Sequence, residues 1–236
     1  MTLHGCVSRL LWLACSMSVG ASFAVVAQAL DLEDCRILFG QTRQKELNAT
    51  LASQRRKADA GDLAARKWLA GVANNRFACY LEELDEGAGW SVIEEPVEGA
   101  AGNSIAVQST NVVDAATIKK NKAAYRALRE AFVSAQAVAD DDVAYRNMAA
   151  RLVADYADAL PDRYADAYRD AIGVRQVACH NREVLSASAA QPFCLSAKSA
   201  SASLYPRLSS AERAAQEAAG LDWAARYLEA KRRGSK

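Results

Sequence analysis

The sequence predicts an all-α protein, built from a helical hairpin and a helical bundle and stabilised by two disulfides. Alanine, the residue with the highest helix propensity, accounts for 51 of the 236 residues, whereas proline occurs only 4 times. Apolar residues recur at helical spacing along most of the chain. Because alanine buries little apolar area, we expect a lean hydrophobic core that gains from covalent cross-links.

The first 29 residues predict a signal peptide that is removed on export. Arg9 precedes an apolar run over 10–26, and the sequence AQA at 27–29 provides the small-x-small pattern of a cleavage site. Two alternatives are a retained membrane anchor, for which the run is short, and a lipoprotein modified at Cys15. No later run is long enough to span a bilayer, so we expect a soluble mature chain that is periplasmic or secreted.

Four cysteines follow the expected cleavage site: Cys35, Cys79, Cys179 and Cys194. An even number of cysteines in an oxidising compartment predicts two disulfides, for which three connectivities can be drawn. We favour Cys35–Cys79 and Cys179–Cys194, because each pair is close in sequence and lies in one half of the chain. Metal binding is the alternative, but no two cysteines have the short spacing of zinc ligands.

Residues 30–85 predict an N-terminal helical hairpin. Asp31 is expected to cap a first helix that runs on towards Leu51, and a break is expected at 59–62. The second helix carries an apolar stripe, formed by Leu69, Ala73, Phe77, Tyr80, Leu81 and Leu84. An antiparallel hairpin would bring the first two of the four cysteines together, in agreement with the favoured pairing.

The helical spacing stops over 86–113, where glycines and Pro96 punctuate two short β-prone runs, 90–93 and 105–107. We expect an irregular excursion or a short β-hairpin, acting as a linker between the two helical parts. Loops of this length inside a domain are often functional. Trp90 is costly to expose in such a loop, so it is expected either to fold back on the core or to anchor a partner.

Residues 114–236 predict a C-terminal helical bundle that packs with 30–85 as one domain. Asp114 is expected to cap a helix whose buried face carries Ile118, Tyr125, Leu128 and Phe132. The remaining surface of this helix carries five cations: Lys119, Lys120, Lys122, Arg126 and Arg129.

Two more helices are expected in the middle of this bundle. Acidic residues at 140–142 suit the N-terminus of the first, which has a stripe at Tyr145, Ala149, Leu152, Val153, Tyr156 and Leu160. Pro161 is expected to start the second, which ends near Cys179. Residues 186–207, rich in serine and alanine, are then expected to form a surface loop tied down at Cys194.

A capping box, Ser209-x-x-Glu212, predicts the start of the final helix. Trp223, Tyr227 and Leu228 are expected to hold this helix to the body of the protein. Gly220 is expected to weaken its middle by about 1 kcal/mol relative to alanine.

The balance of charge excludes a typical nucleic-acid partner. The chain has 29 Lys and Arg against 28 Asp and Glu, and removal of a signal peptide containing Arg9 leaves 28 of each. Nucleic-acid binding normally requires a basic excess that neutralises phosphates. A basic cluster at 231–236 is read as a solvated tail.

Few residues suggest chemistry. Aspartates recur every four residues from Asp158 to Asp170, a carboxylate strip that could in principle bind calcium, but Pro161 interrupts the helix and two arginines neutralise the strip. A solvated helix face is the preferred interpretation. We assign no catalytic, cofactor-binding or metal-binding residue, because His180 is the one histidine after the signal and no triad, phosphate loop or zinc motif is present.

The first functional hypothesis is an exported, non-enzymatic helical protein that binds an envelope protein, of the inhibitor, immunity or assembly-factor kind. Trp90, Glu94 and Glu95 are its candidate partner-binding residues. The second hypothesis is a hydrolase of cell-envelope glycan that uses carboxylates near 82–95.

A third hypothesis is a scaffold of divergent α/α repeats. Ala58, Gly61, Ala65 and Leu69 resemble the short α/α repeats related to tetratricopeptides. The resemblance covers about a dozen residues, and no fixed period recurs along the chain.

Overall fold

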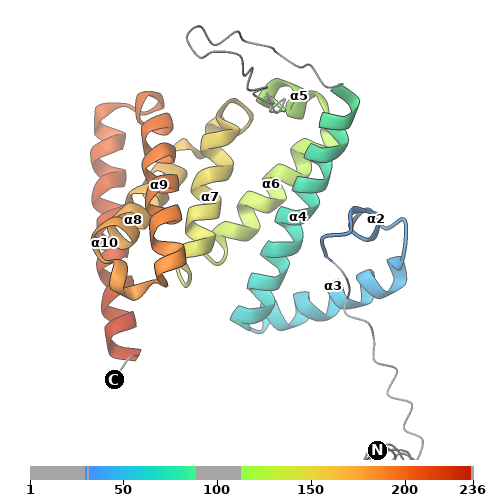
Figure 1. Ribbon diagram of the computed structural model, residues 1–236, viewed down its shortest axis with the longest axis horizontal. Coiled ribbons are helices and arrows are strands. Elements are labelled where there is room, and N and C mark those ends of the chain that lie inside the picture. The colour runs from blue at the N-terminus through green and yellow to red at the C-terminus, as the bar shows by residue number, and fades with distance from the viewer. Residues whose placement is uncertain (1–29, 31, 89–112, 235–236) are drawn as a thin grey trace, which may run out of the picture. The chain divides into compact units, whose positions relative to one another are not determined.

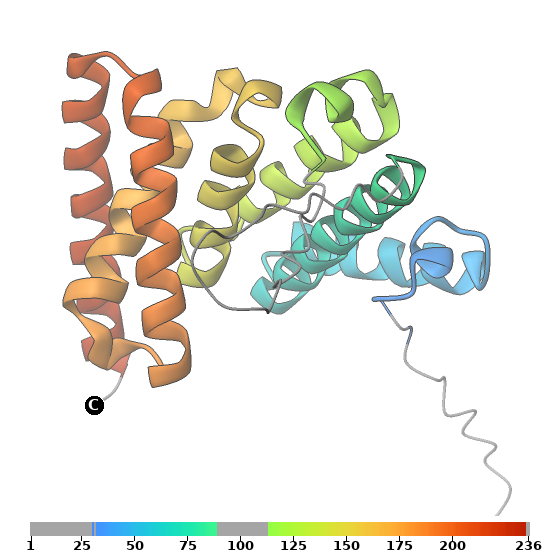
Figure 2. The ribbon, with the colours of Figure 1, turned by 45° about the horizontal axis from the view of Figure 1, so that its top comes forward.

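A computed structural model describes residues 30, 32–88 and 113–234 of the chain (Figure 1). The chain divides into a short N-terminal unit, Met1–Asp31, and one compact unit, Leu32–Lys236. The expected signal peptide therefore lies outside the described residues. The described part of the compact unit is built of helices, with no strand among those residues (Figures 1 and 2), so the all-α fold class is confirmed.

Nine α-helices make up the described part of the compact unit. In chain order they are α2 (Cys35–Leu38), α3 (Gln44–Asp59), α4 (Leu63–Ala88), α5 (Ala115–Lys120), α6 (Lys122–Gln136), α7 (Val143–Asp155), α8 (Tyr164–His180), α9 (Ala187–Leu204) and α10 (Ser210–Gly234). Short 3-10 turns at Ala157–Ala159 and Pro161–Arg163 join α7 to α8.

The expected first helix is in fact two helices, α2 and α3. Asp34 caps α2 by accepting a hydrogen bond from the Arg36 backbone N–H at 2.9 Å, and Asp31, the residue expected to cap this helix, lies outside the described residues. The helix then stops because Gly40 has a φ of 71°, a left-handed conformation that glycine adopts without steric strain. Sequence periodicity continued across this break, so the apolar stripe alone did not reveal it.

The hairpin of α3 and α4 forms as expected. Gly61 makes the turn with a φ of 90°, and Asp62 caps α4 by accepting from the Ala65 N–H at 3.0 Å. The predicted Cys35–Cys79 disulfide is confirmed, with the two Cα atoms 5.5 Å apart. It ties α2 to the C-terminal half of α4.

Helix α4 continues to Ala88, so the region expected to be irregular from residue 86 begins as helix. Both β-prone runs of the expected excursion fall within 89–112, outside the described residues. The described residues thus give no support to a β-hairpin.

The helix expected to begin at Asp114 is also divided, into α5 and α6. Asp114 caps α5, but Asn121 takes extended backbone angles and accepts hydrogen bonds from the N–H groups of Ala123 and Ala124 at 3.0 and 3.1 Å. An asparagine that can satisfy two free amide groups restarts the helix in a new direction. The split allows Ile118 of α5 to be fully buried.

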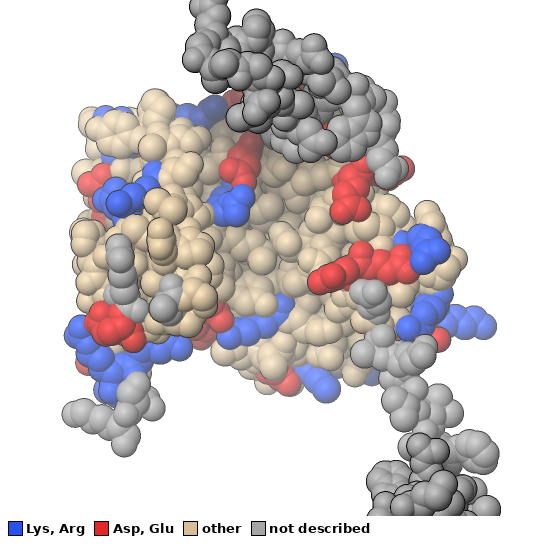
Figure 3. Space-filling view, in the orientation of Figure 1, with Lys and Arg blue, Asp and Glu red and all other residues tan. Residues whose placement is uncertain are grey.

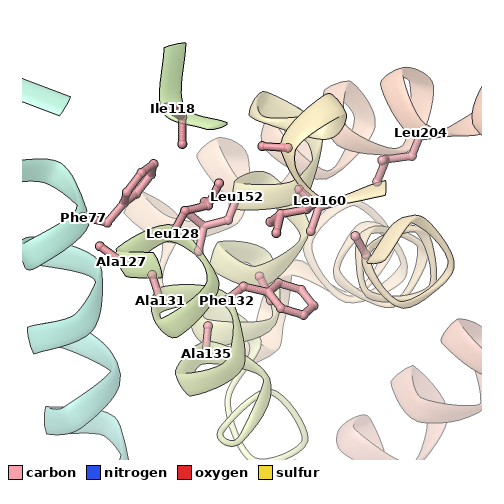
Figure 4. Packing of buried hydrophobic residues seen from close by; sticks show 14 of the residues in the cluster. Phe77, Ile118, Ala127, Leu128, Ala131, Phe132, Ala135, Leu152, Leu160 and Leu204 are labelled. Carbon is pink, nitrogen blue, oxygen red and sulfur yellow. The ribbon is translucent and has the colours of Figure 1, made fainter. Parts of the chain in front are cut away.

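The main hydrophobic core lies between α4, α5, α6 and α7, with contributions from α8 and Leu204 of α9 (Figure 4). Phe77 of α4 points towards α6, whose buried face contributes Leu128 and Phe132 as expected. Many of the remaining buried residues are alanines, including four on α6. The core is therefore made of a few large side chains set among small ones, which lets the helices approach closely.

Residues 186–207 are not a loop, which corrects the expectation from their composition. Residues 187–204 form α9, followed by a 3-10 turn at Tyr205–Arg207, and Pro192 lies within the helix. The buried face of α9 has helical spacing but is made largely of small residues: Ala190, Cys194, Ala197, Ala200, Ser201 and Leu204. The second predicted disulfide, Cys179–Cys194, is confirmed, with Cα atoms 5.0 Å apart, and it joins α8 to α9.

The capping box that opens α10 is confirmed. The Glu212 N–H donates to Ser209 Oγ at 3.2 Å, and the Ser209 N–H donates to the Glu212 carboxylate at 2.8 Å. Trp223, Tyr227 and Leu228 are buried and hold α10 to the body, as expected.

Gly220 has a packing role that its helix propensity alone did not predict. It faces Gly173 at the crossing of α10 and α8, and a Cβ atom at position 220 would lie 2.5 Å from the carbonyl oxygen of Arg169. The two backbones approach closely because neither glycine has a side chain at the crossing.

Replacing Gly220 by alanine is therefore expected to lower the free energy of unfolding by about 1–3 kcal/mol, because the clash with Arg169 outweighs the gain in propensity. Gly71 of α4 is the matched control, since a Cβ atom there would meet nothing within 4 Å. Gly71→Ala should stabilise the protein by up to about 1 kcal/mol. Urea denaturation of both variants checks the prediction, and effects of the same sign would contradict it.

Candidate interaction surface

The outer face of α6 is the most distinctive described surface. Lys122, Arg126, Arg129 and Val133 lie along α6 at intervals of four, three and four residues, so they share one face. Residues on the opposite side of the helix, such as Leu128 and Phe132, enter the core. The sequence had placed cations on this surface, and the structure confirms that Lys119, Lys120, Lys122 and Arg126 are exposed.

A groove of about 590 Å³ follows this face. We call it the α6 groove, and its lining residues are Lys119, Lys122, Tyr125, Arg126, Arg129, Glu130 and Val133. Val133 is 56% exposed, which is unusual for a valine within a helix that has a well-packed inner face. The groove thus combines an exposed apolar side chain and a tyrosine with cationic side chains.

The cations of the α6 groove differ in how they are held. Arg129 donates from Nη1 to the Tyr125 hydroxyl at 3.1 Å and from Nη2 to Asp162 at 3.2 Å. The hydrogen bond to Tyr125 and the charge of Asp162 raise the pKa of Arg129 above its ordinary value. In contrast, Lys119, Lys122 and Arg126 form no ion pair with any residue that the structure describes. Their charge is available to an external anion.

One acid lies at the edge of the groove. Glu130 is 3.7 Å from Nη1 of Arg76 on α4, so its charge is already compensated. The lining of the groove consequently keeps a positive balance, although the protein as a whole is nearly neutral. A surface of this kind favours anionic ligands over cationic ones.

The carboxylates proposed for glycan hydrolysis do not form a recognisable pair. Glu82 and Glu83 are exposed on α4, and Oε2 of Glu82 lies 3.5 Å from Sγ of Cys35. That approach is a contact and not a hydrogen bond, since a disulfide sulfur carries no hydrogen. Trp90, Glu94 and Glu95 lie outside the described residues, so their candidate roles stay predictions.

The aspartates from Asp158 to Asp170 do not form a free carboxylate strip. Asp158 pairs with Arg207 and Asp162 with Arg129, while Asp166 lies 3.3 Å from Arg169. Within the described residues, no three His, Cys, Asp or Glu side chains gather as ligands for a metal ion.

Asp170 corrects the interpretation of this series as a solvated face, because it is fully buried. It forms an ion pair with Arg146 of α7, which is 2% exposed, and it accepts hydrogen bonds from Gln136 and Arg169. Burial raises the pKa of Asp170, and the charges of the two arginines oppose that rise. We call Arg146, Asp170, Gln136 and Arg169 the buried charge cluster.

Sequence reasoning missed this cluster, although a signal was present. Asp170 lies three residues after Ala167 and four before Val174, both fully buried, so it falls on the inner face of α8. Arg146 lies in the same way between Val143 and Ala150 on α7. A charged residue flanked by apolar residues at these spacings indicates a buried pair when a partner of opposite sign occupies the same position on a neighbouring helix.

Two further findings bear on function. None of the described helices combines the length and the apolar character that a membrane span requires. Comparison with protein-family models, curated proteins and solved structures gives no match.

Proposed function

We propose that this protein is exported to the periplasm or secreted, and that it is not an enzyme. It acts by binding an acidic segment of another protein in the α6 groove. The observation that carries the proposal is the presence of three cations without ion pairs around an exposed valine and a tyrosine. Protein interfaces are enriched in arginine and tyrosine, and apolar contacts at their centre supply much of the affinity.

The two disulfides support the export part of the proposal, since such bonds persist in oxidising compartments. The kinds of exported binding protein that we propose for this chain are an inhibitor, an immunity protein or an assembly factor.

One observation favours a second candidate, an α/α-repeat scaffold. From α6 to α9, each helix packs on the next one in the chain, and α7 also packs on α9, whereas α10 packs mainly on α8. Stacked helical hairpins have this neighbour-to-neighbour pattern. Such a scaffold would also bind proteins, but over several helices rather than at one groove.

A paired charge reversal tests the α6 groove. The mature protein is immobilised, and partners are captured from envelope extract and identified by mass spectrometry. Lys122→Glu/Arg126→Glu is expected to weaken binding of the captured partner at least tenfold, about 1.4 kcal/mol, and to reduce the salt dependence of binding. The intact mass of the purified natural protein, expected to begin at Leu30, reports export in the same experiment.

Arg55→Glu/Arg56→Glu is the matched control, because it changes the net charge equally at exposed positions of α3. The control should bind the partner as well as the unmodified protein. Equal binding by all three proteins would contradict the proposal that the α6 groove is the binding site. Binding that is lost only when the surfaces of several helices are changed would favour the scaffold. Loss of cell-wall polymer on incubation would favour the hydrolase.

A further inference from the structure

We infer that a hollow between α4, α7 and α9 binds a small, neutral aromatic molecule that carries one hydrogen-bond donor. The hollow has a volume of about 430 Å³. Pockets for small ligands typically measure about 300–1,000 Å³ and combine an apolar lining with a few polar groups. It shares no lining residue with the α6 groove, so this inference is independent of the proposed function.

The walls of the hollow are largely apolar. Phe77 and Leu81 come from α4, Met148 from α7 and Phe193 from the first half of α9. In the view of Figure 3, uncharged surface predominates between the regions of α7 and α4. Aromatic and thioether side chains favour a flat aromatic ring, through edge contacts and sulfur contacts.

A buried amide gives the hollow its polar requirement. Asn147 of α7 lines the hollow and is only 7% exposed, and its Oδ1 is buried without a hydrogen-bond donor among the described residues. Buried polar atoms are almost always paired, because an unpaired one costs free energy in the folded state. A ligand that donates one hydrogen bond to Oδ1 would recover that free energy on binding.

The charged residues at the hollow balance each other. Arg151 and Asp155 are each about half exposed and lie 3.4 Å apart, so they form an ion pair and leave no net charge. A neutral ligand therefore fits this hollow better than an ion. The ligand class that we infer is a bicyclic heteroaromatic ring that carries one N–H group.

Two probes of nearly equal shape test the inference. Indole has one N–H donor, whereas benzofuran has an oxygen atom in that position and no donor. Calorimetric titration at ligand concentrations up to about 1 mM should give saturable binding of indole, a range suited to a ligand of this size. Benzofuran should bind at least tenfold more weakly, because its oxygen would face Oδ1 of Asn147.

Variants assign the donor preference to one residue. Asn147→Leu keeps the branched shape and the number of heavy atoms of the side chain but removes the buried oxygen, so indole and benzofuran should bind it with similar affinity. The same variant should melt at a temperature equal to or above that of the unmodified protein. Asn74→Leu is the control, because it makes the same change at another amide lining the hollow. It should keep the preference for indole.

Each other outcome overturns the inference. Absence of saturable indole binding excludes the hollow as a site for this class of ligand. Equal binding of both probes to the unmodified protein excludes the role of the buried oxygen. A preference for indole that persists in Asn147→Leu places the donor contact elsewhere.

Discussion

Replacing Asp170 by alanine is expected to lower the free energy of unfolding by about 3–5 kcal/mol, the range observed when one partner of a buried ion pair is removed. Asp170 is fully buried, and its carboxylate pairs with Arg146, which is 2% exposed. The variant would leave a buried guanidinium without its main counter-ion. Arg146 would keep only its contacts with Ala139 O at 3.0 Å, the exposed Asp140 and the Trp223 ring.

The control for this prediction is Asp162→Ala. Asp162 pairs with Arg129 at 3.2 Å, but both side chains are substantially exposed, and exposed pairs contribute about 0–1 kcal/mol. Urea denaturation followed by circular dichroism compares the two variants. A double variant, Arg146→Met/Asp170→Leu, removes both charges and should recover much of the lost stability. Equal losses for Asp170→Ala and Asp162→Ala would contradict a role for burial.

The parts of the fold that could be predicted are those in which large apolar residues or strong capping residues carry the signal. The stripe that ends at Leu84 gave α4, and Ser209 with Glu212 gave the start of α10. The disulfides followed from the hairpin topology together with the spacing of the cysteines. In each case the local sequence pattern and the tertiary packing favour the same helix or the same cysteine pair.

Helix α9 could not be predicted because its buried residues are small. Ala190, Cys194, Ala197 and Ser201 lie at intervals of four, three and four residues, but together they present little apolar area. The serines and the two prolines of that segment predict a loop instead. The signal for α9 is the helical spacing of these small residues. That spacing stabilises a helix only when α7 and α8 are in place to pack against it.

The α6 groove was predictable in part. The sequence showed that Lys122 and Arg126 lie on the outer side of a helix, but it did not show which cations would be paired. Arg129 contacts Asp162, 33 residues away in the chain, across a turn whose geometry depends on the core. The exposure of Val133 could not be predicted, because valine is a residue type that is often buried. It depends on how α6 is placed between its neighbouring helices.

Removing the Cys35–Cys79 disulfide is expected to release α2 and α3 while the rest of the protein stays folded. Helix α3 spans sixteen residues, but Leu47 is its single buried one, and the cluster that holds α2 and α3 to α4 is small. Closing a loop of 44 residues is worth about 4 kcal/mol in the chain-entropy model. Without the disulfide, α2 and α3 lose that free energy of stabilisation, and they have few apolar contacts to replace it.

Hydrogen exchange followed by NMR tests this expectation in the variant Cys35→Ala/Cys79→Ala. Alanine is chosen because Cys79 is 3% exposed and serine would bury a hydroxyl. Amides of α3 should lose protection by up to about a thousandfold, which corresponds to about 4 kcal/mol, while those of α8 should change little. The control, Cys179→Ala/Cys194→Ala, opens a 15-residue loop and should act on α8 and α9 instead. If α3 kept its protection in the first variant, its packing on α4 would be stronger than its buried area suggests.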